Sequence, residues 1–279
     1  MKTPEQLKGA IRNMANKKKI RAQEVLQMYL FERMLERLAQ SPYRSNFILK
    51  GGLLISAMIG IGERTTMDMD TTVRGIPMEE KEIVKIIQEI LSVNIDDGIS
   101  FDYKKIEPIH DDPVYNNYRV HIIASYGKIN APLKIDITTG DEITPSAIQY
   151  NYPLLFEDKT IPLMAYTLET ILAEKYETII RRNIGTTRAR DFYDLYTLWR
   201  QHNDEVRIDI LRKAIKATSE KRHSVNELAE WKEIIQDIRE EPFLQTLWRN
   251  YAAVHPYAAE ISFEDVVNCV ELIAQKVNL

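Results

Sequence analysis

The sequence predicts an α+β protein in which strands and helices mix in the first part and helices alone follow. Residues 118–124 and 133–137 are rich in β-branched side chains and alternate in character, as strands do. Beyond Leu163 the strand signals disappear, and apolar residues recur on one helical face in residues 168–179 and again in 192–199. We therefore expect two domains, residues 1–160 and 161–279, with a soft boundary.

The remaining elements follow from the same periodicities. Residues 3–40 are predicted to be helical, because apolar side chains recur at four-residue spacing: Leu26, Leu30, Met34 and Leu38. A short apolar strand is expected at residues 47–49, a helix-like stretch after the glycines that follow, and a further helix over residues 79–91.

Composition narrows the class of protein. A chain of 279 residues with 44% hydrophobic and 28% charged residues is typical of a soluble globular protein. The net charge of −4 argues against coating nucleic acid by bulk charge. A single cysteine, Cys269, excludes a disulfide framework and a cysteine-rich zinc site. With no secretory signal or membrane-length apolar stretch, we expect a cytoplasmic protein without membrane contact.

The most informative segment is residues 46–74. If residues 67–72 form a strand, the side chains of Asp68, Asp70 and Thr72 share one face. Adjacent carboxylates repel each other unless a cation or water separates them, and Mg²⁺ prefers such oxygen ligands. The upstream pair Gly51 and Gly52 exposes backbone N–H groups where a helix begins, which suits phosphate. The alternatives are an ordinary glycine turn and solvated surface charge.

A third carboxylate lies in residues 132–138. Asp136 interrupts an apolar strand, where a desolvated charge needs a cation, a donor or the edge of a cleft. Beside the strand of Asp68 and Asp70 it would complete a trio able to hold two metals. It could instead pair across strands with Lys134, Arg119 or His121.

The helical part carries a second charged cluster. Lys175 lies beside the buried stripe of its predicted helix, and Asp191 and Asp194 lie three residues apart on the next one. Lys175 could be a snorkelling lysine, and Arg188, Arg190 and Asp191 could form a surface ion-pair cluster.

Taken in order, these motifs resemble those of the AbiEii/AbiGii toxin family. The matching segments are LKGG (49–52), RTTMDMD (64–70), KIDI (134–137), ETILAEK (169–175) and RARDFYDLYTL (188–198). The family comprises nucleotidyltransferase-like toxins of abortive-infection and type IV toxin–antitoxin systems. The resemblance implies a DNA polymerase β-like core, with a short mixed sheet and flanking helices, followed by an all-helical domain that completes the active-site cleft.

The resemblance also implies roles for matching residues. Gly51, Gly52, Thr66 and Lys175 would bind the nucleoside triphosphate, and Asp68, Asp70 and Asp136 would bind Mg²⁺. Asp136, Lys175 and Asp191 would be catalytic: Asp136 as base or second-metal ligand, and Lys175 with Asp191 as the essential pair of the helical motif, in the same cleft as Asp68. Two departures matter: Gly52 replaces a serine common at the phosphate loop, and Thr66 replaces a serine before the acidic motif.

The implied function is transfer of a nucleotide from a nucleoside triphosphate to RNA, at the 3′ end of tRNA, which arrests growth and serves antiviral defence. A cognate antitoxin would be encoded alongside and act on expression, without a stable complex. Local basic residues would supply RNA affinity: Arg181, Arg182, Arg188 and Arg190. The alternatives are a protein-modifying nucleotidyl- or phosphotransferase and a non-catalytic nucleotide-binding interaction protein.

Overall fold

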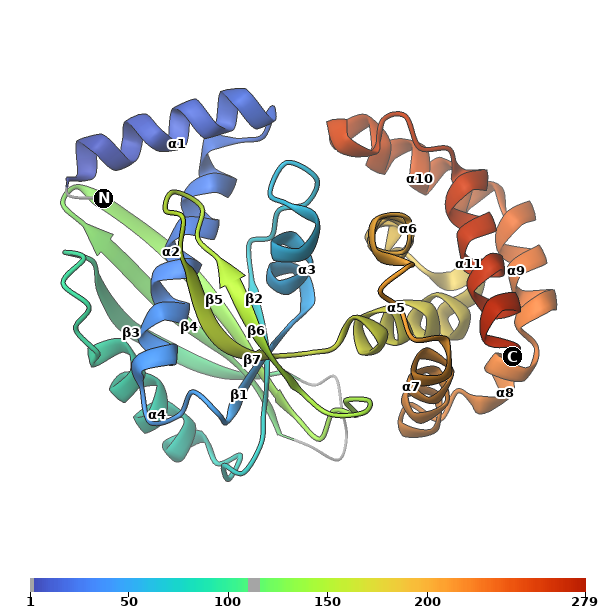
Figure 1. Cartoon of the computed structure of the whole chain (residues 1–279), viewed down its shortest axis with the longest axis horizontal. Coiled ribbons are helices and arrows are strands. Elements are labelled where there is room, and N and C mark those ends of the chain that lie inside the picture. The colour runs from blue at the N-terminus through green and yellow to red at the C-terminus, as the bar shows by residue number, and fades with distance from the viewer. Residues whose placement is uncertain (1–2, 110–115) are drawn as a thin grey trace. The chain divides into compact units, whose positions relative to one another are not determined.

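The computed structural model describes residues 3–109 and 116–279. Its internal contacts divide the chain into two compact units. Unit 1 is the chain up to Asp141 together with Ile148–Ala165, and unit 2 is Glu142–Ala147 together with Tyr166–Leu279. Unit 1 holds every described strand and unit 2 is built of helices (Figure 1), which confirms the α+β class. The predicted domain boundary between residues 160 and 161 stays a prediction.

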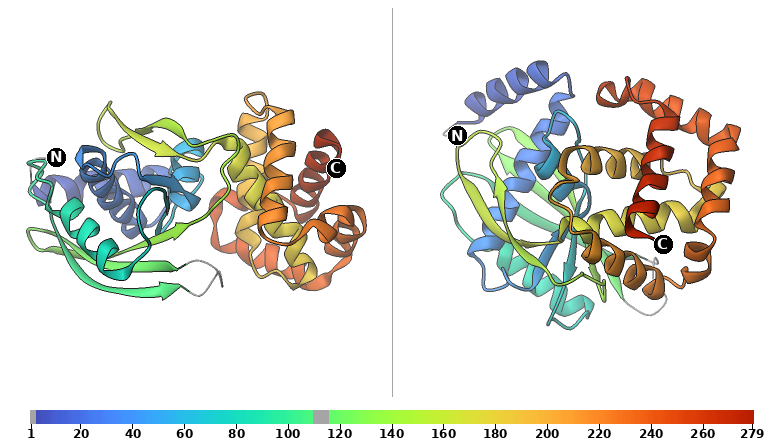
Figure 2. Two further views of the ribbon diagram at one scale, coloured as in Figure 1. Left: turned by 90° about the horizontal axis from the view of Figure 1, so that it is seen from below. Right: turned by 45° about the vertical axis from the view of Figure 1, so that its right-hand side comes forward.

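Within the described residues, unit 1 contains one mixed seven-stranded sheet in the order β3-β4-β5-β2-β1-β7-β6. β1 pairs antiparallel with β2, and β2 pairs parallel with β5. The strands lie side by side in each view (Figures 1 and 2). Their bounds are β1 Phe47–Lys50, β2 Met69–Val73, β3 Ser100–Ile109, β4 Asn117–Tyr126, β5 Ile129–Thr139, β6 Ile148–Pro153 and β7 Thr160–Ala165.

The helices of unit 1 bury their apolar faces against this sheet and one another. They are α1 Pro4–Lys18, α2 Ala22–Gln40, α3 Gly51–Ile59 and α4 Glu80–Ser92. α4 has the strongest stripe, with Ile83, Ile86, Ile87 and Ile90 buried. The predicted helical stretch over residues 3–40 is confirmed with one break, because Lys19 ends α1 in the left-handed conformation at a φ of 55°.

The structure contains strands that the sequence pattern did not reveal. β3 and β6 are the two edges of the sheet, and most of their side chains are exposed or half-buried, so their hydrophobic alternation is weak. In β7 the alternating residues Ile161, Leu163 and Ala165 are buried. That strand is short and directly precedes the helical part of the chain.

Unit 2 is helical, as predicted. Thr167 caps its first helix by accepting a hydrogen bond from the N–H of Thr170. No described helix of the chain is both long and apolar enough to span a membrane. The helices of unit 2 are α5 Leu168–Arg182, α6 Ala189–His202, α7 Ile208–Lys221, α8 Val225–Ala229, α9 Trp231–Glu240, α10 Pro242–Val254 and α11 Phe263–Val277, with 3₁₀ turns at Asn183–Gly185 and Pro256–Ala258.

Candidate active site

The strand register gathers four charged residues into one row of the sheet. Lys50 on β1 lies opposite Asp70 on β2, and Asp70 lies opposite Asp136 on β5. Asp136 in turn lies opposite Arg119 on β4. Residues directly opposite on neighbouring strands share a face, so these side chains stand next to one another. The expected proximity of Asp136 to the Asp68–Asp70 segment is therefore confirmed.

A tight turn from β1 into α3 brings the glycine pair against this row. α3 begins at Gly51, whose φ is 65°, a conformation that favours glycine. A Cβ atom at that position would lie 2.1 Å from Oδ2 of Asp70. The N–H of Gly52 donates to the same carboxylate oxygen at 3.4 Å. The glycines thus allow the carboxylate of β2 to reach the N-terminal end of α3.

The structure gives a physical reason for glycine, instead of the serine of the superfamily pattern, at position 52. A Cβ atom there would lie 2.8 Å from Oγ1 of Thr66 and 3.0 Å from Nη2 of Arg64. Thr66 Oγ1 donates to the carbonyl of Asp68 at 3.1 Å and accepts from its N–H at 3.4 Å. The space that a serine at position 52 would need is therefore occupied by the threonine hydroxyl and a buried guanidinium.

Asp68 and Asp70 present carboxylates at the start of β2, and both are half-buried. In the part of the chain that the structure describes, the Asp68 carboxylate makes no hydrogen bond or ion pair. Two half-buried carboxylates two residues apart are a donor set that Mg²⁺ accepts. Among residues 3–109 and 116–279, no three or more His, Cys, Asp or Glu side chains come together as a metal site.

Asp136 is not a third free carboxylate in this structure. Its Oδ1 and Oδ2 accept hydrogen bonds from Nε and Nη2 of Arg119, each at 2.7 Å. That bidentate bond is the main cause that raises the pKa of Arg119 above its usual value. Of the two sequence-based alternatives, the cross-strand pair with Arg119 is the one formed.

Lys50, at one end of the row, pairs with Asp141, and neither residue had a predicted role. The ammonium of Lys50 donates to Oδ2 of Asp141 at 2.6 Å, and the hydroxyl of Thr138 donates to the same atom at 2.7 Å. Burial alone would raise the pKa of Asp141, but Lys50 and these hydrogen bonds lower it to about 2. Sequence reasoning missed this pair because Lys50 and Asp141 are far apart in the chain.

Unit 2 brings together the residues of the helical motif. Nζ of Lys175 on α5 lies 2.6 Å from Oδ1 of Asp191 and 3.0 Å from Oδ2 of Asp194, both on α6. Asp194 is fully buried and Asp191 nearly so. The alternatives of a snorkelling lysine and a surface ion-pair cluster are therefore wrong. Oδ2 of Asp191 is buried without a hydrogen-bond partner within the described residues.

The predicted basic residues differ in their surroundings. Arg188 and Arg190 are exposed at the start of α6, whereas Arg182 is half-buried. Arg181 donates from Nε to the buried carboxylate of Glu177 at 2.7 Å. Among the described residues, Arg188 and Arg190 are thus the two of these four that face solvent without such a bond.

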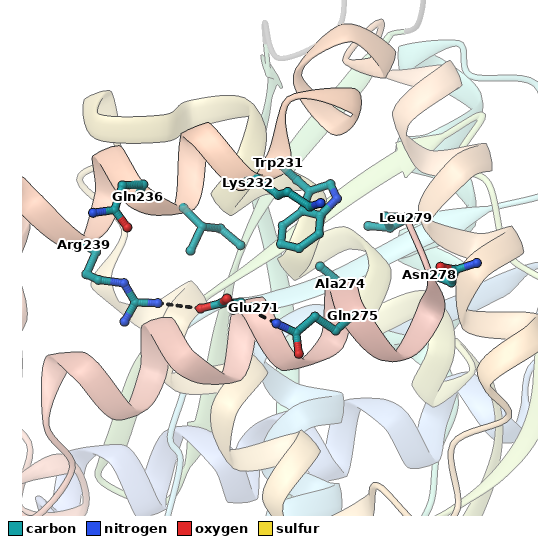
Figure 3. Close-up of a pocket in the computed structure, with 10 residues that line it drawn as sticks. Trp231, Lys232, Gln236, Arg239, Glu271, Ala274, Gln275, Asn278 and Leu279 are labelled. Atoms are coloured by element: carbon teal, nitrogen blue, oxygen red, sulfur yellow. Dashed lines mark hydrogen bonds and ion pairs between the residues drawn. The ribbon is translucent and has the colours of Figure 1, made fainter.

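A pocket of about 480 Å³ lies elsewhere in unit 2, between α9 and α11 (Figure 3). Its lining includes Trp231, Lys232, Arg239 and Glu271. Arg239 donates to Glu271 at 2.6 Å and also contacts Glu264 and Asn268. None of the predicted site residues lines it, so the pocket is separate from the chemistry that the motifs predict.

Comparisons with known proteins bear on both units. Two solved structures from Helicobacter pylori are each similar to this chain at 18% sequence identity. The similarity to JHP933 covers 92% of this chain and 94% of JHP933, with a TM-score of 0.49. The similarity to a protein described as a nucleotidyltransferase covers 93% of this chain and 98% of that protein, with a TM-score of 0.50. At 18% sequence identity, the second of these structures supports the fold of this chain. Among curated proteins, none is similar enough to count as a match.

The family comparison is decisive. The model of the family "Nucleotidyl transferase AbiEii toxin, Type IV TA system" matches residues 33–269. That range includes the glycine turn, the acidic strand, Asp136 and the lysine–aspartate cluster, so the resemblance drawn from the motifs is confirmed. The chain therefore belongs to the AbiEii toxin family, and it is the nucleotidyltransferase of a type IV toxin–antitoxin system.

Proposed function

We propose that this toxin transfers a nucleotide from a nucleoside triphosphate to RNA, with tRNA 3′ ends as acceptor, and that Asp68 and Asp70 hold the Mg²⁺ that the reaction needs. One observation carries the proposal: the Asp70 carboxylate bonds to the first turn of α3, with Asp68 two residues away. A triphosphate at that helix end would meet two carboxylates, and a divalent cation relieves that repulsion.

The protein's own groups are arranged for phosphate. The start of α3 offers backbone N–H groups and the positive end of the helix dipole. Thr66 places a hydroxyl against Gly52, the position at which the superfamily often has serine. When bound, the metal would neutralise phosphate charge and orient the α-phosphorus for in-line attack. Asp68 and Asp70 are the residues whose carboxylate oxygens suit it.

The cluster of unit 2 supplies a fixed charge and an acceptor. Two carboxylates hold the Lys175 ammonium in one position, so its placement costs little further ordering when substrate binds. The unpartnered oxygen Oδ2 of Asp191 suits a hydroxyl donor such as that of a ribose. That Lys175 and Asp191 serve the same nucleotide as Asp68 remains a prediction, supported by the family match across both segments.

RNA as the acceptor rests on the family resemblance, and its binding would depend on local basic groups. The net charge is −4, so affinity must come from local groups, and Arg188 and Arg190 are exposed at the end of α6 that also carries Asp191. Transfer to the 3′ end of tRNA would stop aminoacylation and arrest growth, which suits defence against phage. The cognate antitoxin would then control the toxin through expression.

The test is direct labelling. Purified protein is incubated with each α-³²P-labelled nucleoside triphosphate, total RNA and Mg²⁺, and RNA and protein fractions are separated. We expect label in tRNA, none after chelation, and none with Asp68→Ala. Label in the protein fraction would favour the protein-modifying alternative, and nucleotide binding without any transfer would favour the non-catalytic one. Sequencing RNA 3′ ends after brief expression identifies the acceptor in cells.

A further inference from the structure

We propose that the guanidinium of Arg119 is a fixed cation of the active site and occupies the position next to Asp136 where a second divalent ion would bind. This toxin would then bind one metal ion, at Asp68 and Asp70. The inference rests on the proposed function. It concerns a residue outside all five matching motifs, which enters the site only through the register of β4 with β5.

The geometry at Asp136 carries the argument. A third carboxylate serves a two-metal site by offering an oxygen to the second ion. Here both oxygens of Asp136 accept from the guanidinium of Arg119 at 2.7 Å. A divalent ion on Asp136 would face that permanent positive charge at contact distance, where like charges repel strongly.

The surroundings of Arg119 point to the active site as well. Its side chain is 34% exposed, compared with 16% for Asp136. Besides Asp136, the carboxylates of Asp68 and Glu107 act on the guanidinium through space. Arg119 therefore lies within the field of the metal-binding strand, and its charge is available where phosphate charge develops. Arginine supplies that kind of stabilisation in other phosphoryl-transfer enzymes.

The experiment counts metal ions rather than turnover. Mn²⁺ replaces Mg²⁺, and a nucleoside triphosphate analogue with a non-hydrolysable α,β-methylene bridge fills the site. Free Mn²⁺ is measured by electron paramagnetic resonance and bound analogue by equilibrium dialysis. We expect one Mn²⁺ per bound analogue in the wild type. We expect binding of that ion to weaken about tenfold or more in Asp68→Asn and to persist in Asp136→Asn.

Substitution of the guanidinium gives the decisive result. Arg119→Gln frees the Asp136 carboxylate, so a second Mn²⁺ should appear, and it should be lost again in Arg119→Gln combined with Asp136→Asn. Arg119→Lys keeps a cation and should hold one ion. Lys134→Gln is the matched control: Lys134 is exposed on the same strand as Asp136, its removal changes the net charge equally, and one ion should remain.

Two results would overturn the inference. One is a wild type with two ions, one of which disappears in Asp136→Asn. The other is Arg119→Gln that still binds one ion while its thermal melt equals that of the wild type. Failure of the proposed function looks different, because then the wild type binds no ion with the analogue or Asp68→Asn leaves the ion in place.

Discussion

Replacing Gly52 by the serine that related phosphate loops carry should damage this protein. The new Cβ would lie 2.8 Å from Oγ1 and 3.0 Å from Cβ of Thr66, whereas ordinary contacts begin near 3.4 Å. Thr66 has no easy escape, because its side chain is stiff at χ1 and its hydroxyl bonds both backbone groups of Asp68. The substitution that restores the common motif is therefore incompatible with the local packing.

The expected loss of folding stability in Gly52→Ser follows from overpacking. Extra atoms in a packed site cost about 1–3 kcal/mol, and here the displaced neighbour also loses hydrogen bonds, so we expect about 2–3 kcal/mol. For a protein of this size that lowers the melting temperature by roughly 4–10 °C. Activity should fall further than stability, since Thr66 and the first turn of α3 are both displaced.

The assay is a thermal melt of the wild type and four variants: Gly52→Ser, Thr66→Gly, these two combined, and Gly9→Ser. Gly52→Ser should melt lower, and adding Thr66→Gly should recover part of the loss by removing the blocking side chain. Gly9→Ser is the control, because Gly9 lies in α1 with nothing within 4 Å of its added Cβ. A Gly52→Ser protein with unchanged melting temperature and activity would refute the packing argument, as would a double variant that melts below the sum of the two single losses.

Three further outcomes are expected. Asp68→Ala or Asp70→Ala should abolish transfer and leave the fold intact, because like-charge crowding is relieved while the metal ligand is lost; growth arrest by either variant at normal expression would contradict the metal assignment. Lys175→Ala should weaken nucleotide binding and turnover. It should also lower the free energy of unfolding by about 2–4 kcal/mol, because it leaves the buried carboxylates of Asp191 and Asp194 without their cation. An unchanged melting temperature would count against this stabilising role of Lys175. Asp141, whose pKa is lowered to about 2 when folded, should contribute about 2 kcal/mol that is fully present above pH 4 and lost as the pH falls toward 2. The melting temperature of Asp141→Asn should therefore approach that of the wild type only in acid, and a constant gap down to pH 2 would show that Lys50 does not hold this carboxylate.

The sequence by itself predicted the residues of the candidate site from local patterns. The acidic residues Asp68 and Asp70 with the upstream glycines predicted metal and phosphate binding, because their chemistry depends on neighbours within a few residues. The helical second half was equally readable, since a 3.6-residue period is a local property. The family followed from the order of the five motifs, which needs no coordinates.

Only the tertiary structure decided which long-range partners these residues have. The strand β4 places Arg119 on Asp136, and the same sheet sets Lys50 against Asp141. Such pairs depend on strand order and register, in which one step moves every side chain to the other face. The edge strands β3 and β6 were not predicted for a related reason. A strand with few buried residues shows only a weak hydrophobic alternation in its sequence. The motif residues could therefore be predicted from the sequence, whereas their ion-pair partners depend on contacts between segments that are distant in the chain.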